Sequence, residues 1–109
     1  MKTWDEKLAL YDQLVAANPK FECKGKTVPY TSANGYMFSL INKDGDFGIK
    51  LPKASYQEFM DTFHTTVFKS HGAVMKEFVL VPQDMLENQK LLGPYLDESF
   101  NYVMSLKPK

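Results

Sequence analysis

Arginine is absent from this sequence of 109 residues, so all thirteen of its basic side chains are lysines. Thirteen acidic side chains balance them, and the formal net charge at pH 7 is zero. Bidentate recognition of phosphates and guanine edges is mainly a property of arginine, and a balanced charge gives no long-range attraction to nucleic acid or anionic membranes. A sequence-specific DNA-binding protein is therefore disfavoured.

Cysteine is almost as scarce, since Cys23 is its single occurrence. One thiol excludes an internal disulfide and a metal site built from several thiolates. No segment approaches the roughly 18 consecutive apolar residues of a membrane helix, and the charged start MKTWDEK does not resemble a secretory signal. We therefore expect a cytoplasmic protein that makes no contact with a membrane and carries no metal or other cofactor.

The residues that are present suit one folded domain. Apolar residues make up 44% of the chain and aromatic residues 14%, which argues against disorder. A domain of this length can bury roughly two thirds of the surface that its unfolded chain exposes. We predict a single domain over residues 1–109.

Three segments have the 3.6-residue apolar spacing of amphipathic helices. The first begins with Thr3 and Glu6, the two partners of a capping box. A short helical turn is expected after Pro82, and Gly93-Pro94 should kink the last helix or delay its start. The three helices are predicted over residues 3–17, 54–63 and 89–106.

Five segments have the composition of strands, and turn residues separate them. Asn34-Gly35 and Asp44-Gly45 are pairs that favour tight hairpin turns, and Pro29 places the first strand at a sheet edge. The strands are predicted over residues 27–32, 36–41, 47–51, 66–69 and 73–81. The resulting order, α-β-β-β-α-β-β-α, predicts an α+β fold with an antiparallel five-stranded sheet and flanking helices.

Several short motifs occur in an order that resembles the TfoX N-terminal domain-like family, over about residues 20–106. They are Asn34-Gly35, Met37-Phe38, Asp44-Gly45, Lys50 and Val81-Pro82. The resemblance implies a secretion-chaperone-like α+β fold and a regulatory role, because TfoX/Sxy regulators switch on DNA-uptake genes. The segment KTVPYTS stands where the family often has a glycine-rich MFGG segment, and 109 residues leave no room for the regulators' second domain. We therefore expect a stand-alone, single-domain branch.

The segment from residue 20 to residue 32 interleaves lysines with aromatic residues. A surface of this composition can bind phosphate or single-stranded nucleic acid. Lysines also protect an exposed edge strand from pairing with another chain, and this is the simpler interpretation. The candidate binding residues in this segment are Lys24, Lys26, Tyr30, Thr31 and Ser32.

Three further candidates lie in the strands and in a turn. Lys50 and Lys76 have apolar neighbours, so they either line a polar face of the sheet or extend their ammonium groups to solvent. His71 lies in a Ser-His-Gly turn, and acid–base chemistry there would need a partner such as Glu77. No set of nucleophile, base and orienting group can be assembled from the sequence, so we assign no catalytic residue.

These observations favour a non-enzymatic binding or regulatory domain that acts through protein–protein contact or self-association. Apolar residues such as Met37, Ile41 and Val79 are expected on an open face of the sheet, where a homodimer would cover them. One alternative is a nucleic-acid-associated transcription or competence regulator. A second alternative is a small-molecule-binding protein or an enzyme whose reaction the sequence does not indicate.

Overall fold

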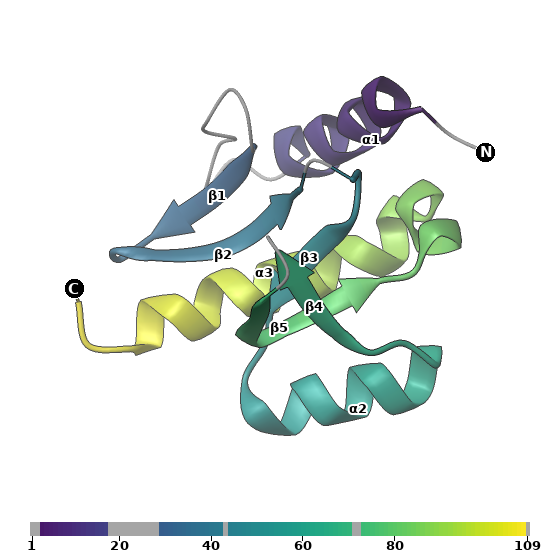
Figure 1. Ribbon diagram of the computed structural model, residues 1–109. Helices are drawn as coiled ribbons and strands as arrows, with labels where there is room; N and C mark the ends of the chain where they lie inside the picture. Colours follow the sequence, from purple (N-terminus) through teal and green to yellow (C-terminus); the bar gives the residue numbers. More distant parts are fainter. Residues whose placement is uncertain (1–2, 18–28, 43, 71–72, 109) are drawn as a thin grey trace.

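An antiparallel five-stranded sheet in the order β1-β2-β3-β5-β4 forms the framework of the computed structural model (Figure 1). The structure describes residues 3–17, 29–42, 44–70 and 73–108. The strands are β1 (Tyr30–Ala33), β2 (Tyr36–Ile41), β3 (Phe47–Lys50), β4 (Val67–Ser70) and β5 (Ala73–Val81). The predicted α+β class and element order are confirmed.

In the described part of the chain, three α-helices and one 3-10 helix accompany the sheet. They are α1 (Trp4–Ala16), α2 (Lys53–Phe63), η1 (Gln83–Glu87) and α3 (Gln89–Ser105). The side chain of Thr3 accepts a hydrogen bond from the backbone of Glu6, and Glu6 accepts one in return, so the predicted capping box is confirmed. Pro94 lies inside α3 but does not delay its start, which is Gln89.

Local turn chemistry sets the β1–β2 hairpin. Asn34 and Gly35 have φ angles of 56° and 85°, the positive values that a two-residue hairpin turn requires. The predicted turn is therefore confirmed. Pro29 precedes β1, which is an edge strand as expected, whereas positions 27–28 of the predicted strand lie outside the described residues.

One face of the sheet forms the main core against the helices. Cross-strand rows of this face contain Ile49 beside Val79 and Ile41 beside Phe47, and Tyr11 of α1 packs edge-on against the ring of Phe47. Ile41 and Val79 are 0% exposed, so their predicted position on an open face is wrong. The helices cover them, whereas Met37 is 37% exposed. The covering that we expected from a homodimer comes largely from the chain itself.

The second face carries a separate apolar cluster. Leu40, Gly48 and Leu80 form one row across β2, β3 and β5, and Phe68 of β4 lies on this row. The side-chain amide of Asn42, just after β2, donates to the carbonyl oxygen of Lys69 at 3.3 Å. Strand β4 therefore crosses over this face, and Figure 1 shows it passing over β3 and β5.

A bulge in β5 makes this crossing possible. Val67 pairs with Val79, whereas Lys69 pairs with Val74, so β5 advances five residues while β4 advances two. Bulges bend and twist a strand, and this one turns the first half of β5 together with β4 over the sheet. We call residues 67–70 and 73–77 the hairpin arm.

Candidate functional site

Glu77 lies in the β5 bulge and has a φ of 66°, in the left-handed region. A side chain in this conformation costs on the order of 1–3 kcal/mol, and such residues persist only where the surrounding structure holds them. They occur often at functional sites and at switching elements. The contacts of Glu77 therefore define the first candidate site.

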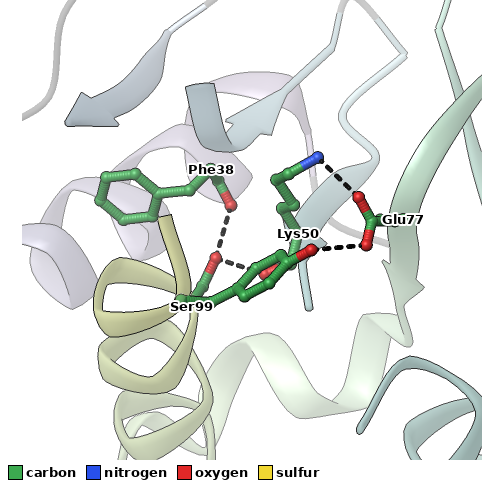
Figure 2. Close-up of polar contacts among 5 residues, drawn as sticks. Phe38, Lys50, Glu77 and Ser99 are labelled. Carbon is green, nitrogen blue, oxygen red and sulfur yellow. Dashed lines mark hydrogen bonds and ion pairs between the residues drawn. The ribbon is translucent and has the colours of Figure 1, made fainter. Parts of the chain in front are cut away.

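Two side chains hold the carboxylate of Glu77 (Figure 2). The ammonium group of Lys50, at the end of β3, lies 3.3 Å from Oε1. The hydroxyl of Tyr102, on α3, donates a hydrogen bond to Oε2 at 2.7 Å. These contacts join β3, β5 and α3 at one point, and we call the three residues the Glu77 cluster.

A buried serine connects the same helix to the sheet. Ser99 is 0% exposed, and its hydroxyl contacts the carbonyl oxygens of Phe38, at 3.1 Å, and of Lys50 (Figure 2). Ser99 and Tyr102 are three residues apart on α3, so they lie on the same side of the helix. The backbone and the side chain of Lys50 are thus both fixed by α3, the latter through Glu77.

The Glu77 cluster has fixed protonation states near neutral pH. Desolvation by burial raises the pKa of Glu77, but the hydrogen bond from Tyr102 and the charges of Lys50 and Lys76 outweigh it, so the pKa lies below its usual value. The hydrogen bond to Glu77, together with burial, raises the pKa of Tyr102 to about 12. General acid–base catalysis requires a pKa near the working pH. This arrangement therefore favours a structural ion pair over proton transfer.

The surroundings of Lys50 are partly apolar. Its ammonium group lies 5.6 Å from the centroid of the Phe78 ring, which belongs to the cluster on the second face. The side chains of Lys50 and Glu77 are 13% and 24% exposed, so solvent screens their attraction only in part. Lys76 is exposed and acts on Glu77 through its charge.

The candidate binding residues of the sequence analysis lie in different places. Lys50 and Lys76 both flank Glu77. Thr31 is 0% exposed and its hydroxyl lies 2.5 Å from that of Ser39, in the interior. Tyr30 and Ser32 are half-buried in β1, and Tyr30 packs beside the second-face cluster. Lys24, Lys26 and His71 lie outside the residues that the structure describes.

Sequence reasoning missed Tyr102 and Ser99 and considered Glu77 only as a partner for a histidine. The available signal was the polar pair Lys76-Glu77 inside the otherwise apolar run AVMKEFVLV. That pair marks an irregular point in a strand, but the strand register and the position of α3 are needed to find its partners.

A pocket on α2 is a second candidate site. An open pocket of about 540 Å³ lies at the first turns of α2, where its described lining consists of Lys53, Ala54, Tyr56 and Gln57. Across residues 3–17, 29–42, 44–70 and 73–108, no group of three or more His, Cys, Asp or Glu side chains could hold a metal ion. In the same part of the chain, no helix is long and apolar enough to cross a membrane.

Comparisons of the chain with protein-family models, curated proteins and solved structures found no significant match. The resemblance to the TfoX N-terminal domain-like family therefore stays a prediction.

Proposed function

We propose that this chain is a non-enzymatic binding domain that recognises an extended segment of a partner protein along the hairpin arm. The observation that carries the proposal is the pairing of β5. The second half of β5 pairs with β3 as far as Lys50, which lies opposite Phe78. The next backbone hydrogen bond runs from the amide of Leu51 to the carbonyl oxygen of Glu77. Before Glu77, the strand pairs with β4 alone in the described part of the chain.

The edge of β5 before Glu77 has the properties of a strand-addition site. Unpaired backbone groups on an edge can bind an extended peptide, and alternate side chains then contact it. Val74, a β-branched residue that favours strands, is 58% exposed on this edge, with Ala73 and Lys76 exposed beside it. A partner segment with apolar residues and an acidic residue opposite Lys76 would fit this surface.

The alternatives have less support from the geometry. General acid–base catalysis by Glu77 or Tyr102 is most efficient with a pKa near the working pH, and both groups are held away from neutral pH. A phosphate-binding surface would need cations that are free to contact phosphate, whereas Lys50 is paired with Glu77. The resemblance to TfoX-type regulators adds support for a regulatory binding role, since the element order agrees with the α+β layout that it implies.

The test is site-specific photo-crosslinking in a lysate of the source cells, with and without nuclease. A photoreactive residue replaces Val74 in one variant and Met104 in the control, because Met104 is a similarly exposed apolar residue (51%) on α3. We expect a discrete, nuclease-resistant adduct from position 74 only, and its mass distinguishes a second copy from another protein. Equal labelling from both positions, no adduct, or loss with nuclease would contradict the proposal.

A further inference from the structure

We propose that the hairpin arm is a hinged flap that opens from the second face of the sheet, with Glu77 as its hinge and Lys50 and Tyr102 as its latch. The inference deepens the proposed function, because the edge of β5 that would bind the partner segment lies in the arm. It adds that this arm has a closed and an open state. Three structural relationships support it.

The first relationship is the position of the hinge. The pairing between β3 and β5 reaches the carbonyl oxygen of Glu77. Val67 pairs with Val79 at the base of the arm, and the pairs beyond this base, such as Lys69 with Val74, are internal to the arm. The arm can therefore move as one body without losing its own ladder. Rotation about the backbone of Glu77 would break the bond from Asn42 to Lys69 and the packing of Phe68 on Gly48, and it would leave the pairing between β3 and β5 in place.

The second relationship is the separation of the two apolar clusters. Leu40, Phe68 and Phe78 form a cluster that is distinct from the main core, and the arm supplies Phe68 as its central ring. Segments with their own small cluster open locally at lower free energy than the whole domain unfolds. Opening the arm would uncover this cluster and leave the packing between the helices and the first face intact.

The third relationship is that the backbone and the side chain of Glu77 have opposite effects on the closed arm. The left-handed backbone of this residue is unfavourable in the closed arm, so opening would relieve it. The contacts of its carboxylate with Lys50 and Tyr102 hold this residue in its closed position, because they come from β3 and α3, outside the arm. The same residue thus favours opening through its backbone and closing through its side chain. An element of this kind can be shifted by a ligand that binds one state better.

The test is amide hydrogen exchange of the isolated protein, followed residue by residue by NMR. Tyr102→Phe removes the hydroxyl that holds Glu77 and keeps the ring. Tyr36→Phe is the matched control, since it removes a tyrosine hydroxyl that donates its hydrogen bond to the carbonyl oxygen of Lys107. We expect roughly tenfold faster exchange in residues 67–70 and 73–77 of Tyr102→Phe, because a hydrogen bond to a charged group is lost, and unchanged rates in α1 and β2.

Equal acceleration throughout the domain would overturn the inference, since the contact would then stabilise the fold as a whole. Unchanged exchange in the arm would also overturn it. Glu77→Gln provides a second measurement, because it keeps the size of the side chain, weakens both latch contacts and should give the same local pattern. The experiment needs no partner, so a selective opening of the arm would stand even if photo-crosslinking refuted the proposed function.

Discussion

The ring of Phe68 lies directly against Gly48: a Cβ atom built on Gly48 would be 2.7 Å from Phe68 Cγ. Gly48 is needed here for space rather than for an unusual backbone conformation, since it has no positive φ. It occupies the middle of the row between Leu40 and Leu80. The absence of a side chain at this one position allows β4 to cross the sheet.

Gly48→Ala should therefore destabilise the domain by about 1–3 kcal/mol, because a methyl group in a packed apolar site displaces its neighbours. Urea unfolding followed by circular dichroism measures the change. Phe68→Leu provides the coupled control, since it shortens the side chain that the methyl group meets. We expect the double variant to lose less stability than the sum of the two single variants, and simple additivity would show that the two positions do not interact.

A buried hydroxyl chain joins α1 to the first two strands. Ser39 is its central member, at 2.8 Å from the Tyr11 hydroxyl and 2.5 Å from the Thr31 hydroxyl. Ser39→Ala should cost more stability, about 2–3 kcal/mol, than Thr31→Val at about 1 kcal/mol, because it removes two buried hydrogen bonds instead of one. Thermal unfolding of both variants measures which one loses more stability, and a larger loss for Thr31→Val than for Ser39→Ala would contradict this account.

Signals contained in a few neighbouring residues were sufficient to predict much of this fold. The capping box of Thr3 and Glu6 and the turn at Asn34-Gly35 depend on residues at most three apart, and both are confirmed. The composition of the run AVMKEFVLV, rich in residues that favour strands, likewise located β5 over the predicted range, 73–81. Such features follow from the hydrogen-bonding geometry and the side-chain spacing within a short segment of the chain.

Features that depend on residues distant in sequence were not predicted. The Glu77 cluster joins residues from β3, β5 and α3. The polar pair Lys76-Glu77 marks the bulge on which the cluster depends, but it does not identify the partners on the other elements. The burial of Ile41 and Val79 required knowledge of which face the helices cover. Both faces of these strands are apolar in sequence, so alternation alone could not assign them.

Asn34 has a second role beyond its turn. Its side-chain amide donates to the carbonyl oxygens of Val103 and Leu106, both at 2.8 Å, and so binds the C-terminal end of α3. Asn34→Gly keeps the favourable backbone and loses these bonds, for an expected cost of about 1–2 kcal/mol. Asn34→Ala should cost roughly 1 kcal/mol more, because alanine is strained at positive φ.

Urea unfolding of the two Asn34 variants separates the contributions of the side chain and the backbone. Asn101→Ala, an exposed change on the same helix, should stay within about 0.5 kcal/mol of the parent. If Asn34→Gly were as stable as the parent, the contacts with α3 would carry no net stability and only the turn conformation would matter.

The stability of the domain should depend on the ionisation of Glu77. The pKa of its carboxyl group is lower in the folded protein than in the unfolded chain. A depressed pKa contributes stability above the unfolded pKa, here 4.5, and that contribution is lost as the pH falls through the folded value. Glu77→Gln should therefore cost about 1 kcal/mol at pH 7, and the difference from the parent should shrink steadily below pH 4.5.

Urea unfolding of both proteins at several pH values between 3 and 7 measures this difference. Glu58→Gln serves as the control, because it neutralises an exposed carboxylate on α2 away from Lys50 and Tyr102. The control measures the effect of neutralising a solvent-exposed carboxylate, and the change in the Glu77→Gln difference with pH should exceed it. A difference between parent and Glu77→Gln that stayed constant down to pH 3 would contradict this account, because the ionisation of Glu77 would then contribute no stability.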